Sequence, residues 1–387
     1  MPLAHPNPLV SRLSPPPIPS VVAWARDYNG GKGPLIDLSQ AVPGYPAHPE
    51  MLRLLGEAAA SPAMTGYGAI EGEEALRKAY AAHMSDVYGT SVAAANIHIT
   101  SGCNQAFMCS TIALAKSGET IALTNPFYFN HETTLSMLGI GRVLVDCDAA
   151  KGFLPSLASA EKALLSGVRA LAVVTPNNPT GAVYPPALLR ELFHLCRKYG
   201  AWLILDETYR DFLPADAGAP HDLLSIEGWD ETLVLLYSFS KSFCIPGHRL
   251  GAITAGPRIV GEIAKIMDNM QICAPRAAQA AVATALPILA DWRAANRLEI
   301  SRRAEALKAV MAETNGWSIA AIGAYFAFVR HPCGDLPSAT VAERLAKEAG
   351  VICIPGSYFG ESQDGYLRLA FANADVGVIG QLRERLR

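Results

Sequence analysis

Short apolar runs alternate with helix-like segments through the middle of the chain, and this alternation restricts the possible folds more than any other feature. Seven runs predict strands, at residues 97–100, 120–123, 142–146, 170–174, 202–206, 232–237 and 251–255. Helices are expected around them, including residues 73–88, 105–115, 131–138 and 186–199. Such alternation is typical of a parallel sheet that helices cover on both faces. We therefore predict an α/β fold with a mostly parallel seven-stranded sheet between helices.

The pattern changes after about residue 290. A long amphipathic helix is expected at 292–314 and another helix at 339–349, with strand-like runs at 325–330, 351–354 and 365–371. A chain of 387 residues is longer than one typical domain. We expect a large domain at 43–290 and a smaller α+β domain at 291–387. Residues 1–42 would form an N-terminal arm and part of the small domain.

The start of the arm, residues 1–34, is expected to be irregular. Prolines crowd positions 15–17 and 19, and proline cannot donate a backbone hydrogen bond. Gly30, Gly31 and Gly33 favour turns. Such an arm could be disordered, or it could lie across a partner subunit.

Composition argues against several classes of function. The net charge is −3 and no run of like charges occurs, so neither nucleic acid nor an anionic membrane is an expected partner. No stretch approaches the roughly 18 consecutive apolar residues of a membrane span, and no secretory signal is recognised. The eight cysteines form no CxxC pair, which favours free thiols and no metal site. A cytoplasmic protein with a small-molecule ligand is expected.

One lysine is distinguished by its neighbours. Lys241 ends the segment YSFSK, so Ser238 and Ser240 precede it, and Arg249 follows eight residues later. An amine can form an imine with an aldehyde, while hydroxyl groups and a guanidinium can bind phosphate. The segment suits a phosphorylated aldehyde cofactor, although a surface lysine near an unrelated arginine would give the same pattern.

Two upstream runs end in polar residues. The run 170–174 leads into the rigid turn NNPTG at 177–181, at the kind of position where open parallel sheets bind ligands. The run 202–206 ends in Asp206, and a buried carboxylate needs a partner such as a pyridinium N–H⁺. Taken separately, the turn could be an ordinary connection, and the aspartate could cap a helix or bind a metal.

The three motifs follow one another as NNPTG at 177–181, DETY at 206–209 and SFSK at 238–241 with its following arginine. In this order and spacing they resemble the class I/II aminotransferases of pyridoxal-phosphate (PLP) fold type I, the aspartate aminotransferase superfamily. The resemblance runs from about Ile36 to the C-terminus. It implies pyridoxal 5'-phosphate as the cofactor and a large sheet domain joined to a smaller α+β domain.

The resemblance implies a role for each motif residue. Lys241 forms an aldimine with PLP and shuttles the proton between the substrate Cα and the cofactor C4′. Asp206 pairs with the pyridine nitrogen, and Asn178 and Tyr209 hydrogen-bond the phenolic oxygen. The phosphate is held by Ser238, Ser240 and Arg249.

Upstream segments supply further cofactor-binding residues by the same resemblance. A turn at 101–104 opens a helix, whose first backbone N–H groups bind phosphate at Gly102, Cys103 and Asn104. Tyr128 stacks on the cofactor face, and His131 supports Asp206 from behind. Tyr67 reaches from one subunit to the phosphate of the other, which implies a homodimer with shared active sites.

Substrate recognition is assigned in the same way. Arg368 lies in the apolar run 365–371, where its guanidinium needs a partner. The α-carboxylate of the substrate is apt because the guanidinium binds it through two hydrogen bonds. Asn178 also contacts the substrate, and the loop carrying Ala41 and Tyr45 faces it. Ala41 stands where related enzymes commonly have glycine, and its methyl group would tighten the pocket near the carboxylate.

The amino donor is less well defined. Arg276 lies in roughly the region of the partner-subunit arginine that gives related enzymes their dicarboxylate specificity, and whether it reads a substrate side chain stays open. The pocket for the side chain is expected to include aromatic residues, namely Tyr45, Tyr325 and Phe326. These residues favour aromatic or bulky donors.

The leading hypothesis is an aminotransferase that moves an amino group from an L-amino acid to a 2-oxo acid by a ping-pong mechanism. A PLP-dependent lyase, such as a C–S β-lyase, or a decarboxylase would use nearly the same residues on the same fold. Release of pyruvate and ammonia from cysteine-like substrates, with no added 2-oxo acid, would favour the lyase. A non-catalytic binding module is a third reading, but the arm is short and not basic, unlike a DNA-binding extension.

Overall fold

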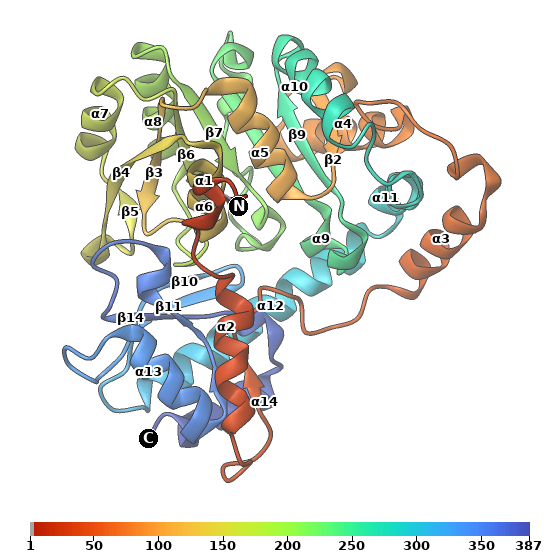
Figure 1. The fold of residues 1–387 in the computed structure, drawn as a ribbon. Coiled ribbons are helices and arrows are strands. Elements are labelled where there is room, and N and C mark those ends of the chain that lie inside the picture. Colours follow the sequence, from red (N-terminus) through yellow and green to blue (C-terminus); the bar gives the residue numbers. More distant parts are fainter. Residues whose placement is uncertain (1–3) are drawn as a thin grey trace.

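The computed structural model describes residues 4–387, and a large twisted sheet dominates its upper part in Figure 1. Within this range the sheet has eight strands in the order β2-β9-β8-β7-β6-β3-β4-β5. Their bounds are β2 Ile97–Thr100, β3 Thr120–Asn125, β4 Gly141–Asp148, β5 Leu154–Pro155, β6 Ala170–Val174, β7 Trp202–Asp206, β8 Leu233–Ser238 and β9 Gly251–Ala255. The five strands from β8 to β4 are parallel, whereas β9 is antiparallel to both neighbours and β5 is antiparallel to β4.

All seven predicted strands are present, and the α/β fold with a mostly parallel sheet is confirmed. The sheet has one strand more than predicted, because β5 extends it beyond β4. β5 contains two residues, Leu154–Pro155. A segment of that length is too short to show any apolar periodicity, so the sequence carries no sign of it.

The central strands are buried on both faces, which explains their uninterrupted apolar runs. Successive residues of a strand point to opposite faces of the sheet. Leu203 and Leu205 of β7 therefore pack into one core with residues of three helices, α4 (Glu74–Tyr88), α8 (Pro186–Lys198) and α11 (Arg276–Ile288). Ile204 packs into a second core with residues of α5 (Cys103–Leu114) and α10 (Pro257–Met270). The sheet lies between these two helical layers.

Eight helices of the large sheet region are α3 Pro49–Ala60, α4 Glu74–Tyr88, α5 Cys103–Leu114, α6 Phe129–Leu138, α7 Leu157–Leu165, α8 Pro186–Lys198, α10 Pro257–Met270 and α11 Arg276–Ile288. The predicted helices at 73–88, 105–115, 131–138 and 186–199 correspond to α4, α5, α6 and α8, with ends that agree within two residues. Apolar periodicity was therefore a sound guide to these four.

A second, antiparallel sheet with the order β10-β11-β14-β13 forms around its own core. Its elements are α12 Ala290–Ala312, β10 Ser318–Gly323, β11 Phe326–Arg330, α13 Ser338–Arg344, β12 Val351–Ile352, β13 Ile354–Pro355, β14 Tyr366–Leu369 and α14 Val376–Arg385. β1 (Ile36–Asp37) pairs with β12, and Ile36 and Leu38 enter the same core. The division at residues 43 and 291 stays a prediction.

The expectation that residues 1–34 are irregular was wrong, although residues 1–3 lie outside the described residues. The segment contains α1 (Pro8–Ser11) and α2 (Pro17–Trp24), which are drawn in red in Figure 1. Pro17 and Pro19 lie in the first turn of α2, where a backbone N–H has no helical acceptor and its loss costs little. Val21 is fully buried and belongs to a cluster with Phe328 and Ile352. Tertiary packing thus stabilises a helix in a segment whose prolines had led us to predict irregular structure.

None of the helices within residues 4–387 is both long and apolar enough to cross a membrane. The same residues contain no group of three or more His, Cys, Asp or Glu side chains arranged to hold a metal ion. All eight cysteines are free, and Cys109, Cys196 and Cys353 are buried. Buried thiols of this kind pack as small apolar side chains.

Four parallel strands end at one edge of the large sheet. β3, β6, β7 and β8 end at Asn125, Val174, Asp206 and Ser238 respectively. The carboxyl ends of parallel strands commonly form a ligand-binding crevice.

Candidate active site

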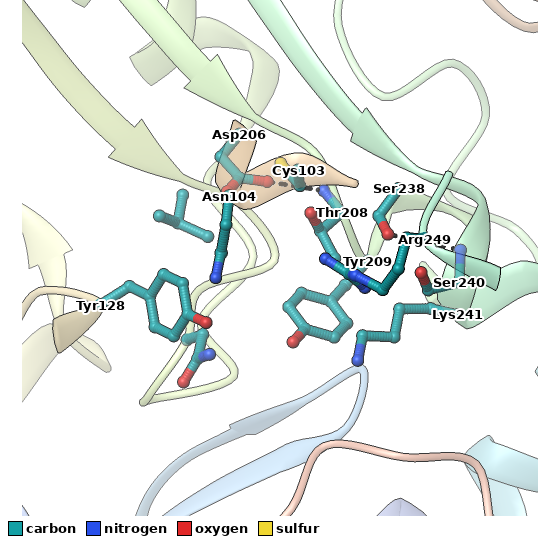
Figure 2. Close-up of a pocket in the computed structure, with 12 residues that line it drawn as sticks. Cys103, Asn104, Tyr128, Asp206, Thr208, Tyr209, Ser238, Ser240, Lys241 and Arg249 are labelled. Carbon is teal, nitrogen blue, oxygen red and sulfur yellow. Dashed lines mark hydrogen bonds between the residues drawn. The ribbon is translucent and has the colours of Figure 1, made fainter. Parts of the chain in front are cut away.

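A cavity of about 140 Å³ opens at this edge of the sheet. One water molecule needs roughly 10–15 Å³ on the same measure, so the cavity has room for a larger ligand. Figure 2 shows Lys241, Arg249, Ser238 and Ser240 on one side and Tyr128 on the other. The lining residues are Cys103, Asn104, Tyr128, Val174, Asn178, Asp206, Thr208, Tyr209, Ser238, Ser240, Lys241 and Arg249. Ten of these twelve were predicted from the sequence.

Asp206 ends β7 at the back of the cavity, and only 4% of its surface is exposed. Its Oδ1 accepts a hydrogen bond from the backbone N–H of Thr208 at 2.9 Å. Its Oδ2 lies 3.3 Å from Nε2 of His131, whose ring stacks on Phe107. Burial alone would raise the pKa of Asp206, but the contacts with His131 and Thr208 lower it below its ordinary value. The cavity therefore contains a buried carboxylate that stays ionised, with His131 behind it as predicted.

Lys241 lies in the short helix α9 (Phe239–Ser242), directly after β8. Its Nζ donates a hydrogen bond to the carbonyl oxygen of Ala41 at 2.6 Å. Burial, together with the positive charges of Arg249 and Arg368, lowers the pKa of Lys241 to about 8. This amine can therefore lose its proton near neutral pH, as a nucleophile or a general base must.

A cluster of hydrogen-bond donors lies near the start of α5, on the same side of the cavity as Lys241. Gly102 precedes this helix with φ of 88°, a conformation that glycine adopts without strain. A Cβ atom at Gly102 would lie 2.4 Å from Nη2 of Arg249, so the guanidinium rests directly on the glycine. Oγ of Ser240 is buried and has no hydrogen-bond partner among the described residues. The free N–H groups at a helix start, a guanidinium and an unsatisfied hydroxyl together suit an anion such as phosphate.

Arg368 lies in β14, with 1% of its surface exposed. It donates from Nη1 to Oδ1 of Asn178 at 3.0 Å and from Nη2 to the carbonyl oxygen of Ser39. Its Nε is buried without a partner, and no carboxylate of residues 4–387 forms an ion pair with it. A buried guanidinium without a counter-charge is costly. Arg368 is therefore not neutralised by a structural salt bridge. The carboxylate of a ligand would supply its missing counter-charge.

Two tyrosines complete the walls. The hydroxyl of Tyr128 accepts a hydrogen bond from Nδ2 of Asn130 at 2.7 Å, and its ring borders the cavity. The ring of Tyr209 packs edge-on against Phe326 with centroids 5.0 Å apart. Burial raises the pKa of Tyr209 well above its ordinary value, so its hydroxyl stays protonated and can donate a hydrogen bond.

Several predicted residues do not line the cavity, and Tyr67, Tyr45 and Arg276 are among them. Tyr67 is 80% exposed, as a residue that reaches a second subunit would be in a single chain. The hydroxyl of Tyr45 is buried without a partner in the described part of the chain, and its ring packs edge-on against Trp292. Arg276 donates from Nε to Oε1 of Glu73 at 2.7 Å and from Nη2 to Oε2 at 3.4 Å. Its guanidinium is already engaged by a carboxylate.

Sequence reasoning missed two contacts of the site. Thr208, inside the DETY motif, lines the cavity and its N–H binds Asp206. Ser39 supplies the carbonyl oxygen that accepts from Arg368. An aspartate commonly accepts from the N–H two residues later, so Thr208 could have been inferred from the motif. The contact of Ser39 depends on residues 329 positions apart and has no local signal.

Comparisons with known proteins agree with this geometry. The sequence model of the family "Aminotransferase class I and II" matches residues 33–386. The chain is 28% identical to an aromatic aminotransferase of Arabidopsis thaliana, over 91% of this chain and 89% of that protein. It is 27% identical to an aspartate aminotransferase of Pyrococcus abyssi, over 92% of each. The crystal structure of an aromatic aminotransferase from Pyrococcus horikoshii superposes with a TM-score of 0.85 at 28% identity, covering 91% of this chain and 94% of that one.

These similarities favour transamination over the lyase and decarboxylase alternatives, because the named relatives are aminotransferases. The sheet, the second α+β unit and the three motifs agree with fold type I. The match of the family model extends over nearly the whole chain. The chain therefore belongs to the class I and II aminotransferases, a family of PLP-dependent transaminases.

Proposed function

We propose that the cavity holds PLP and that the chain transfers amino groups from aromatic or bulky apolar L-amino acids to 2-oxo acids. The residues present fit the cofactor. Oγ of Ser240 and Nε of Arg368 are buried donors without partners in the described part of the chain. Gly102 has no side chain, which lets the guanidinium of Arg249 lie directly against the start of α5. When bound, PLP supplies an aldehyde that condenses with amines and a ring that accepts electron density from the substrate Cα.

The proposed roles follow from the chemistry of each side chain. Lys241 binds the cofactor covalently and, as a free amine, takes up and returns the proton at the substrate Cα. Asp206 keeps a proton on the pyridine nitrogen, while Asn178 and Tyr209 donate to the phenolic oxygen. Tyr128 stacks on the ring face. The phosphate is bound by Ser238, Ser240, Arg249 and the backbone of Gly102, Cys103 and Asn104.

The observation that most supports the donor class is the contact of Arg276 with Glu73. Arg276 donates from Nε and Nη2 to the two carboxylate oxygens of Glu73, and from Nη1 to two backbone carbonyl oxygens, so its guanidinium is already engaged and is poorly placed to bind a dicarboxylate side chain. Tyr325 lies near the site, because its hydroxyl donates to the carbonyl oxygen of Lys241 at 3.4 Å. Ala41 faces Lys241 through its backbone, and Tyr45 packs within reach of the same loop. Aromatic surroundings favour aromatic donors.

We further propose a cytoplasmic homodimer in which Tyr67 binds the cofactor phosphate of the partner subunit. The ring of Tyr67 is 80% exposed and is therefore free to contact a second subunit, which supports this role. Arg276 also donates to the carbonyl oxygen of Gly66 at 3.2 Å, and so fixes the loop beside Tyr67. Arg276 would then act on the geometry of the dimer rather than on the substrate.

A panel of amino donors tests the proposed activity. We expect phenylalanine, tyrosine and tryptophan to exceed aspartate in kcat/KM by at least about tenfold, with 2-oxoglutarate or pyruvate as acceptor, because an unpaired side-chain carboxylate in this pocket would be penalised. The rates are measured by coupled assays of the 2-oxo acid product. A preference for aspartate would contradict the donor class. Release of pyruvate and ammonia without a 2-oxo acid acceptor would contradict the transaminase assignment.

Replacing Arg368 with alanine should lower kcat/KM for amino acids about 10–100-fold, since hydrogen bonds to a charged group contribute roughly 1.5–3 kcal/mol. Arg368→Lys keeps the charge without the planar fork and should recover only part of the loss. 2-Phenylethylamine, which has no carboxylate, should react at similar rates with all three proteins. The exposed Arg330 on the neighbouring strand β11 is the control, and Arg330→Ala should change nothing. Equal losses for amines and amino acids would contradict the role of Arg368.

Gly102→Ala should raise the dissociation constant of PLP about 10–100-fold, because the new methyl group would push Arg249 away from the phosphate. Gly118→Ala is a matched control. Gly118 has φ of 85° and Gly102 has φ of 88°, but a Cβ at Gly118 meets no atom within 4 Å. Both substitutions place a Cβ at a residue with positive φ, and the contact with Arg249 occurs only at Gly102. Equal cofactor affinities, measured by fluorescence titration of the apoenzymes, would contradict the phosphate site.

A further inference from the structure

A second cavity, of about 280 Å³, shares no lining residue with the PLP cavity. It lies between α4, the first turns of α12, and the chain from 210 to 220, which begins with the short helix η5 (Arg210–Phe212). Its charged walls carry His83, Arg210, Asp211, Arg293 and Arg297. None of these residues has a role in the proposed transamination.

The charges on these walls do not balance. Arg210 lies 3.5 Å from the buried Glu207, which stands behind the wall. Arg293 lies 3.6 Å from Asp211, the one carboxylate among the lining residues. Arg297 forms no ion pair with any carboxylate of residues 4–387, so one positive charge is left over. The cavity is therefore electropositive.

Asp211 is already engaged through both of its oxygens and forms no ion pair with Arg297. Oδ1 faces Arg293, and Oδ2 accepts a hydrogen bond from the hydroxyl of Tyr237 at 2.6 Å. The nearby arginines also affect the pKa of His83. Burial, followed by the charge of Arg210, lowers the pKa of His83 to about 4, and Arg293 acts in the same direction while Asp211 opposes it.

Several donors around the cavity lack acceptors. Nε of Arg210, Arg293 and Arg297 and Nε2 of His83 are buried without a hydrogen-bond partner in the described part of the chain. The side chains of Arg210 and Arg293 are exposed by only 2% and 10%. A buried donor without an acceptor is destabilising, and more so when it is charged. Three arginine donors of this kind beside one cavity, together with the unpartnered ring nitrogen of His83, indicate an acceptor from outside the chain.

The remaining walls are apolar. Val87 of α4, Leu213 and Pro214 of the loop, and Ala290 and Ala294 of α12 line the cavity between the charged groups. A bare inorganic anion would leave these surfaces against water. We propose that this cavity binds a small organic carboxylate, with its oxygens facing Arg293 and Arg297 and its apolar part against Val87 and Leu213.

Anomalous diffraction from crystals of the PLP-loaded enzyme soaked with 4-bromobenzoate tests the proposal without any substitution. We expect bromine density in the second cavity, with the carboxylate toward Arg293 and Arg297. Bromine found only in the PLP cavity, or an acidic side chain of a second copy of the chain filling the second cavity, would overturn the proposal.

Calorimetry measures the affinity of the PLP-loaded enzyme for benzoate and compares it with that of variants at Arg297. Arg297→Ala should weaken binding at least tenfold, and Arg297→Lys by less. Arg302→Ala is the control, because Arg302 lies on the same helix with its side chain 75% exposed. Acetate should bind more weakly than benzoate, since it lacks the apolar part. Benzoate binding that is unchanged in Arg297→Ala would overturn the proposal.

The ring of His83 gives a second readout that a merely structural role of Arg297 would not move. Its pKa, followed by NMR of labelled histidine, should rise when benzoate saturates the unsubstituted enzyme, because an anion offsets the nearby arginines. Absorbance of the bound cofactor reports any benzoate in the PLP cavity separately. A His83 pKa that does not respond to benzoate would overturn the proposal.

Discussion

Lys241→Ala should abolish transamination, with turnover falling about 10⁴-fold or more, because the substitution removes both the covalent attachment and the proton acceptor at the substrate Cα. No other lysine lines the cavity, within the part of the chain that the structure describes. The absorbance of the lysine-bound cofactor should disappear in the same variant. Steady-state kinetics and a visible spectrum of the purified protein measure both effects.

Lys265→Ala is the matched control, since Lys265 lies on α10 with its side chain 72% exposed and paired with Glu262. It should keep full turnover and the full spectrum.

The unsubstituted apoenzyme offers a further check through pH. Only the neutral amine attacks the aldehyde, so the rate of cofactor uptake should rise with pH and level off above about 8, where the pKa of Lys241 lies. A midpoint near 10.5, the ordinary lysine value, or turnover retained in Lys241→Ala, would contradict the assignment.

The sequence predicted the large sheet well because its strands are buried on both faces. Runs such as 170–174 and 202–205 are apolar throughout, and polar residues bound them, so both position and length could be inferred. The cavity was predictable for the same reason. Its polar residues follow the last apolar residue of each strand, and parallel strands bring those ends to one edge. Asp206, Asn178 and Lys241 meet there.

The sequence did not reveal contacts that join distant segments. Asn178 and Arg368 lie 190 residues apart, and Lys241 binds the carbonyl of Ala41 from 200 residues away. Backbone carbonyls carry no sequence signal, so such contacts depend on the folded arrangement of both cores. The short strand β5 and the proline-rich helix α2 were missed for a related reason. Both are stabilised by neighbours rather than by their own composition.

Asp206→Asn should lower kcat about 10²–10³-fold, the usual cost of removing one preorganised electrostatic contact at a reacting centre. The amide keeps the size of the carboxylate and can still accept from the N–H of Thr208, but it carries no negative charge. It therefore cannot hold a proton on the pyridine nitrogen. Because Lys241 is intact, the cofactor should remain covalently bound, which separates this variant from Lys241→Ala. Kinetics and the visible spectrum are recorded together.

The neighbouring groups distinguish a chemical role of Asp206 from a structural one. His131→Gln removes the side chain that lies 3.3 Å from Oδ2 but leaves the carboxylate charge, so its effect on kcat should be several-fold smaller. Thermal unfolding should change little in Asp206→Asn, since neutralising a buried charge offsets much of the lost pairing. A variant that melts early and loses its cofactor would indicate that Asp206 mainly supports the fold. Full activity of Asp206→Asn would show that this carboxylate does not control the protonation of the pyridine nitrogen. The proposed role of Asp206 in the mechanism would then be wrong.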